Sequence, residues 1–122
     1  MGKIKRFEDI GAWQKARMLV NKIYSITSDG LFTKDLALKD QIRRASISVM
    51  LNIAEGFARK TKKEFAKFLY IAHGSVAEVQ SSLYIALDLK YISNEQFSSL
   101  YSDCEEISKI ISGLIKYLED KQ

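Results

Sequence analysis

Apolar residues recur every three or four positions along most of the chain, which is the spacing of one face of an α-helix. The first such stripe consists of Ile10, Trp13, Ala16, Val20, Ile23 and Thr27. Asp9 stands before the stripe and is expected to cap the helix, because a short acidic side chain accepts hydrogen bonds from the first free backbone N–H groups. Residues 27–30 end this helix, since Gly30 readily takes the left-handed conformation found after helices.

Two more helices are expected in the middle of the chain. One begins at Thr33 or Asp35 and runs to about Gly56. Residues 61–64, Thr-Lys-Lys-Glu, form a capping-box pattern, in which the first and fourth side chains satisfy each other's backbone N–H groups. This pattern opens a third helix that extends to about Lys90.

A second capping box, at residues 93–96, opens a fourth helix with a regular heptad pattern. Its apolar positions are Phe97, Leu100, Cys104, Ile107, Ile111, Leu114 and Leu118. Such a seam packs best against a nearly parallel or antiparallel neighbour. Because only residues 91–93 join the third and fourth helices, these two must fold back as a hairpin. The expected fold is all-α: an antiparallel up-down-up-down four-helix bundle that forms a single domain over residues 1–122.

The second helix carries more apolar surface than one buried stripe requires. Residues 45–54 contain no charged side chain. A helix that is apolar most of the way round is buried on more than one side, and a bundle of this size covers only one. The surplus face favours a second copy of the chain as partner, hence a homo-oligomer. The alternative is a tight bundle core that includes the small serines.

Composition agrees with a folded domain and excludes several kinds of site. Of the 122 residues, 47% are hydrophobic and 28% charged, the balance of a globular protein. One cysteine and one histidine leave no disulfide framework and no Cys/His metal centre, so no cofactor and no metal are expected. No apolar run approaches the roughly 18–20 residues that span a bilayer, and the basic start lacks the apolar part of a secretory signal. We therefore expect a cytoplasmic protein without a membrane partner.

Positive charge is concentrated in the first three quarters of the chain. Residues 1–90 carry 16 basic and 9 acidic side chains, whereas residues 91–122 carry 3 basic and 6 acidic ones. The densest basic cluster consists of Arg59, Lys60, Lys62, Lys63 and Lys67. At the start of the third helix it can hold phosphate groups. Without visible base-reading aromatics, it would position a nucleic-acid backbone rather than read bases. The alternative is a solvated loop that keeps the protein soluble.

Arg43 and Arg44 are the second candidates for phosphate binding, because the planar guanidinium suits phosphate and carboxylate equally. The favoured interpretation is structural: they pair with Asp40, or with Glu105 and Glu106 of the fourth helix across a subunit contact.

Enzyme chemistry finds little support in the residue pattern. Asn52 and Glu55 interrupt an apolar stretch, and a buried Glu55 could act as a base, but such groups more often make structural hydrogen bonds. The residue three before His73 is Tyr70, whereas di-iron bundles need Glu there, so a hydrogen-bonded structural histidine is expected.

Three small or soft residues are expected to serve packing. Gly56 either ends the second helix or permits close approach of another backbone. Gly74 and Ser75 indicate a close helix crossing. Cys104 lies on the apolar seam of the fourth helix and is expected to be an inert core thiol.

Several segments together resemble the bacterial four-helix bundle proteins known as 23S rRNA intervening-sequence proteins, or S23-type proteins. The matching segments are residues 7–10, 13–16, 41–48, 52–59 and 64–78, of which Asn-Ile-Ala-Glu-Gly at 52–56 is the most specific. The resemblance covers about residues 7–118. One departure is Val-Met-Leu at 49–51, where the family usually has a proline, so the second helix is expected to be straighter here.

The resemblance implies an antiparallel bundle assembled as a homo-oligomer, a ring-like pentamer, without enzymatic activity. It suggests RNA binding, because some members are encoded inside insertions in 23S rRNA genes, and a similar bundle is a basic nucleic-acid-binding accessory of diversity-generating retroelements. We therefore expect binding of RNA or DNA by the two basic clusters. The alternatives are a protein–protein adaptor ring without nucleic-acid binding and, more weakly, a hydrolase that uses Glu55.

Overall fold

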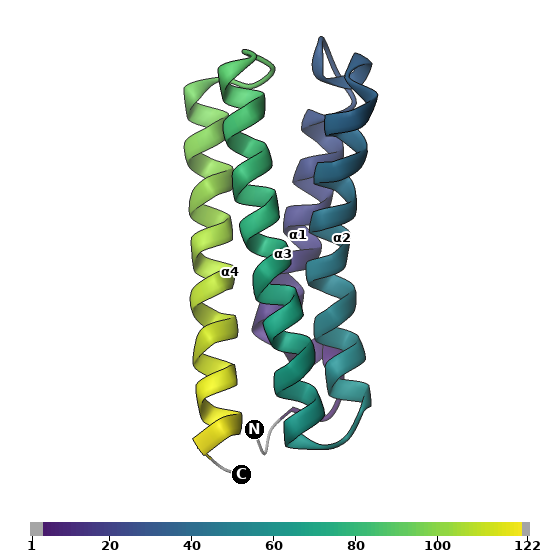
Figure 1. Cartoon of the computed structure of the whole chain (residues 1–122), viewed down its shortest axis with the longest axis vertical. Coiled ribbons are helices and arrows are strands. Elements are labelled where there is room, and N and C mark those ends of the chain that lie inside the picture. Colours follow the sequence, from purple (N-terminus) through teal and green to yellow (C-terminus); the bar gives the residue numbers. More distant parts are fainter. Residues whose placement is uncertain (1–3, 121–122) are drawn as a thin grey trace.

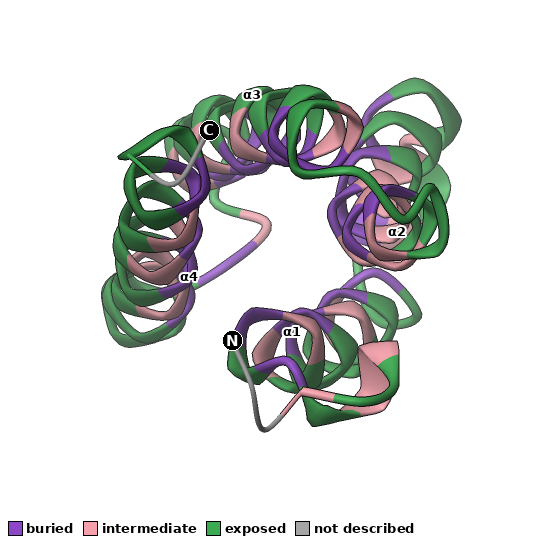
Figure 2. Cartoon of the chain, turned by 90° about the horizontal axis from the view of Figure 1, so that it is seen from below, coloured by how far each residue is buried: buried purple, intermediate pink, exposed green. Residues whose placement is uncertain are grey.

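Four long helices run antiparallel in the computed structural model, which describes residues 4–120 (Figure 1). They are α1 (Gly11–Ile26), α2 (Leu36–Ala58), α3 (Lys62–Asp88) and α4 (Asn94–Asp120). Two short 3-10 helices, η1 (Phe7–Asp9) and η2 (Phe32–Lys34), precede α1 and α2. Seen along the bundle, the helices follow one another around a common axis in chain order (Figure 2). The all-α, up-down-up-down four-helix bundle is therefore confirmed.

Every helix turns its buried residues toward that axis, and the heptad seam of α4 is largely the one expected (Figure 2). Cys104 is fully buried on this seam, and burial raises the pKa of its thiol to about 12. It is a core residue, as expected. Leu114 is only half-buried, and Ile115, exposed by 6%, takes its place in the core.

Helix starts follow the capping signals at three of the four helices. Asp35 Oδ1 accepts a hydrogen bond from the backbone N–H of residue 38 at 3.1 Å and begins α2. Thr61 Oγ1 accepts one from the N–H of Glu64 at 3.2 Å and begins α3. Before α4, Ser93 Oγ and Gln96 Oε1 each accept from the other's backbone N–H, at 3.0 and 2.8 Å. This last pair is a complete capping box.

The expectation that Asp9 caps the first helix is wrong. Ile10 is the N-cap of α1 and has no side-chain oxygen to offer. The Asp9 carboxylate instead accepts hydrogen bonds from the backbone N–H groups of Lys5 and Arg6, both at 3.1 Å. Asp9 therefore secures the short helix η1 that precedes α1, and this contact fixes where the chain enters the bundle.

Gly56 permits the close approach of two helices and does not end α2, which continues to Ala58. A Cβ atom at this position would lie 2.8 Å from Phe68 Cβ and 3.0 Å from Phe65 Cδ1. At Gly74 no atom lies within 4 Å of such a Cβ, and the residue is exposed, so the predicted crossing there is wrong for Gly74. Ser75 beside it is buried against α2.

The uncharged stretch of α2 does leave apolar surface outside the bundle. Leu51 is 59% exposed, and Ile47 and Ala54 near it are half-buried. A hydrogen bond between Ser48 and Ser75 sets α2 against α3, and the antiparallel pairing places Ile71, itself 45% exposed, level with residues 51–52.

Among residues 4–120, none of the helices is both long and apolar enough to cross a membrane.

Candidate nucleic-acid interface

The predicted basic cluster lies at the turn between α2 and α3, at one end of the bundle (Figure 1). Arg59 is the C-cap of α2, and Lys62 and Lys63 are the first residues of α3. Lys60 has a φ angle of 68°, a left-handed conformation that is uncommon outside glycine. Lys67 follows one turn into α3, and all five side chains of the cluster are exposed. The structure thus brings the whole cluster together on one surface.

The basic residues of this turn differ in whether a carboxylate of the protein neutralises their charge. Arg59 makes ion pairs with Glu55 at 2.9 Å and Glu64 at 3.8 Å, and its guanidinium lies 4.9 Å from the ring centre of Phe68. Within residues 4–120, no carboxylate pairs with the side chain of Lys60 or Lys63. These two lysines therefore present unneutralised charge to solvent.

Two further basic residues lie at the same end of the bundle, and the sequence reasoning did not find them. Lys5 and Arg6 precede η1, which packs against α1 and α2 at the end of the bundle that holds the α2–α3 turn (Figure 1). Arg6 also pairs with Glu8 at 3.4 Å. We call the combined surface the basic end; it consists of Lys5, Arg6, Arg59, Lys60, Lys62, Lys63 and Lys67.

A cavity of about 160 Å³ opens beneath the same turn. Its lining residues are Phe57, Lys60, Thr61, Lys62, Phe65 and Leu118. The apolar part comes from three different helices, α2, α3 and α4, and only Leu118 lies far from the basic run in the sequence. Phe57 and Phe65, which flank the basic run in the sequence, thus line a cavity beside it in the structure as well.

Arg43 and Arg44 lie away from the basic end, toward the opposite end of the bundle. Arg44 Nε donates to Asp40 Oδ2 at 2.8 Å, which confirms the structural pairing expected for it. Arg43 instead donates from Nε to Thr27 Oγ1 at 2.8 Å, and its guanidinium lies 4.2 Å from the ring centre of Tyr24. Arg43 therefore ties α2 to α1 within the chain.

Glu55, the weaker candidate for a catalytic base, lies at the surface of α2. Its side chain is half exposed and is paired with Arg59. Asn52 Nδ2 donates to the carbonyl and hydroxyl oxygens of Ser48 at 2.9 and 3.0 Å, and Ser48 shares a hydrogen bond with Ser75. Both polar residues of the apolar stretch thus make structural contacts, as expected.

His73 is a hydrogen-bonded residue between two helices, again as expected. Its Nε2 lies 2.8 Å from Ser108 Oγ and links α3 to α4. Nothing in the part of the chain that the structure describes bonds to its other ring nitrogen, so a catalytic triad is not formed. Nearby, Tyr70 donates to Glu119 at 3.0 Å, and this hydrogen bond raises the pKa of the tyrosine. Over residues 4–120 no three metal-binding side chains come together.

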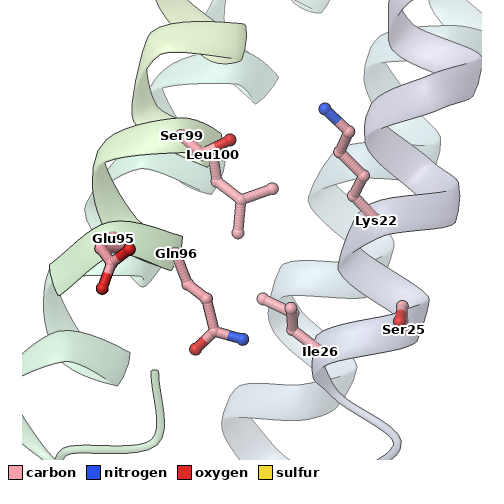
Figure 3. Close-up of a pocket in the computed structure, with 7 residues that line it drawn as sticks. All are labelled: Lys22, Ser25, Ile26, Glu95, Gln96, Ser99 and Leu100. Carbon is pink, nitrogen blue, oxygen red and sulfur yellow. The ribbon is translucent and has the colours of Figure 1, made fainter. Parts of the chain in front are cut away.

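A larger groove, of about 330 Å³, lies between the C-terminal part of α1 and the start of α4 (Figure 3). Ile26 and Leu100 give it an apolar floor, and the Gln96 side chain points into it (Figure 3). Lys22, on its rim, donates to Asp103 at 2.8 Å, and Gln96 belongs to the capping box of α4. Two of its polar side chains are thus already engaged, and the groove lies far along the bundle from the basic end.

Comparison with known proteins identifies the family. The family model described as 23S rRNA-intervening sequence protein matches residues 8–113. A crystal structure of a protein of unknown function from the S23 ribosomal protein family of Bacteroides thetaiotaomicron superposes with a TM-score of 0.80 at 25% identity. The superposition covers 86% of this chain and 95% of that one. Among curated proteins none matches. The chain, with its four-helix bundle and its motif at residues 52–56, belongs to the 23S rRNA-intervening sequence protein family.

Proposed function

We propose that this protein is a non-catalytic, cytoplasmic helical-bundle protein that binds RNA or DNA through the phosphate backbone. The gathering of seven basic side chains at one end of the bundle carries the proposal. Lys60 and Lys63 supply unneutralised charge there, and Lys is a compact point charge that suits phosphate oxygens. The family's description, which refers to intervening sequences of 23S rRNA, agrees with a nucleic-acid partner.

Fluorescence anisotropy of a labelled structured RNA and of a DNA duplex tests this proposal. We expect binding at about 50 mM salt that weakens steeply as salt increases, because each phosphate contact releases counterions. Four contacts to a single strand correspond to a loss of about 50-fold in affinity between about 50 and 200 mM salt. The slope of log affinity against log salt counts the contacts that form.

Absence of binding at the lower salt would contradict the proposal. It would leave the basic end as a solubilising surface and favour the adaptor ring, whose exposed apolar residues on α2 and α3 would then bind a protein. Such a contact depends little on salt, since apolar burial rather than ion release stabilises it.

We further propose that the chain assembles as a homo-oligomer, a ring-like pentamer, through the outward face of α2 and α3. Leu51 on α2 and Ile71 on α3, both exposed and at about the same level of the bundle, support this face as the contact. Repetition of the basic end around a ring raises avidity for a long polyanion without any new contact.

Replacing Leu51 by glutamate is expected to convert the oligomer to a monomer, because a charge in the subunit contact loses its hydration. Size-exclusion chromatography with light scattering measures the mass directly. Leu31→Glu is the matched control, since Leu31 is 62% exposed but lies in the loop between α1 and α2. An unchanged mass for Leu51→Glu would exclude this face as the contact.

A further inference from the structure

The cavity beneath the α2–α3 turn joins an aromatic surface to a basic rim. Phe57, Phe65 and Leu118 form its apolar part, and Lys60 and Lys62, both exposed, line it where it meets solvent. Its volume of about 160 Å³ is below the roughly 300–1,000 Å³ of pockets that hold drug-sized ligands. It therefore suits one small planar ring system that carries negative charge on an attached group.

The two rings of the cavity are arranged to receive such a planar group. The ring centres of Phe57 and Phe65 are 5.9 Å apart, and the ring planes meet at 77°. A flat group stacked on one ring then lies nearly perpendicular to the other, and both stacked and perpendicular arrangements are favourable between aromatic rings. Phe57 is half-buried, whereas Phe65 is only 5% exposed, so Phe57 is the more accessible stacking surface.

We propose that this cavity takes up one unpaired nucleobase, whose neighbouring phosphates lie on Lys60, Lys62 and Lys63. An apolar cavity excludes the phosphate itself, while the lysines attract it, so a nucleotide meets both parts at once. In a duplex the faces of the bases are stacked inside and unavailable, whereas single strands expose them to aromatic side chains. The preferred ligand is therefore a single-stranded segment.

This inference rests on the proposed function, and one comparison separates the two. Two labelled strands of equal length and charge are used, about 12 nucleotides of oligothymidylate and the same backbone made entirely of abasic nucleotides. We expect the abasic strand to bind about tenfold more weakly, because it has no base to stack in the cavity. The slope of log affinity against log salt should be the same for both strands, because both offer the same phosphates. Equal affinity for both strands overturns the base cavity and leaves phosphate binding standing. No binding of either strand overturns both proposals.

Substitution of the stacking ring locates the base. Phe57→Leu keeps the side chain apolar but removes the ring, and it is expected to weaken oligothymidylate binding about tenfold while leaving abasic binding unchanged. Phe97→Leu is the matched control, a half-buried ring near the opposite end of the bundle. Equal binding of oligothymidylate by Phe57→Leu and Phe97→Leu overturns the assignment. Circular dichroism checks that each variant keeps its helicity. If a variant does not fold, the comparison of oligothymidylate with the abasic strand on the unsubstituted protein still tests the base cavity.

Discussion

Replacing Lys60 and Lys63 together by glutamate is expected to weaken nucleic-acid binding by at least a hundredfold, beyond measurement in an anisotropy titration. Each substitution removes a phosphate contact and places a negative charge beside the remaining cations. Because the two lysines have no carboxylate partner among residues 4–120, their loss breaks no internal ion pair. Glutamate at position 63, in the first turn of α3, also complements the helix dipole. Helicity and oligomer mass should therefore stay unchanged.

The matched control for this pair is Lys34→Glu with Lys90→Glu, at the opposite end of the bundle. It changes the net charge by the same amount, and Lys90, with φ of 63°, even shares the left-handed conformation of Lys60. Binding by the control and none by the Lys60 and Lys63 variant would locate the interface at the basic end. Equal weakening in both variants would mean that the overall charge, not this surface, attracts the nucleic acid.

The elements of this fold were predictable where local chemistry decides them. The capping box of Ser93 and Gln96 lies within four residues, and both of its hydrogen bonds form. Asp9 is an equally good helix-capping residue by its type and position. Its carboxylate, however, can accept hydrogen bonds either from the backbone N–H groups that follow it or from those that precede it. It takes the N–H groups of Lys5 and Arg6, and a sequence pattern cannot rank these two options.

The core of α4 shows where a regular pattern loses accuracy. A heptad repeats every 3.5 residues, but a straight helix turns every 3.6, so the predicted seam drifts around the helix by about 20° per heptad. The expected positions hold at Cys104, Ile107 and Ile111, and again at Leu118. Between Ile111 and Leu118 the turn of 3.6 residues favours Ile115 over Leu114.

The candidate site likewise has one part that the sequence predicts and one part that only the folded structure shows. The basic run at residues 59–63 was visible because its members are neighbours in sequence. Lys5 and Arg6 lie at the same end of the bundle only through the packing of η1 on α2, and Leu118 completes the cavity beside the run from the far end of the chain. Contacts between distant segments depend on tertiary packing, which no local pattern records.

Replacing Gly56 by alanine is expected to lower the free energy of unfolding by up to about 2 kcal/mol. The added methyl group would lie 2.8 Å from Phe68 Cβ and 3.2 Å from the carbonyl oxygen of Phe65, and neither atom can rotate away. Overpacking of this kind costs about 1–3 kcal/mol, whereas the better helix propensity of alanine returns only about 1 kcal/mol. For a chain of this size, thermal unfolding should show a Tm lower by up to about 8 °C.

Gly113→Ala provides the control, because Gly113 lies inside α4 with no atom within 4 Å of an added Cβ. There the propensity gain acts alone and should raise the free energy of unfolding by about 0.5–1 kcal/mol. An equal gain at both glycines would show that α2 and α3 do not approach closely at Gly56. A loss of stability at Gly56 and a gain at Gly113 would show that the close packing of α2 on α3 stabilises the fold. Gly56 lies three residues before Arg59, so this packing also holds the start of the basic end. The same close approach that alanine disturbs sets the α2–α3 turn on which the basic end is built.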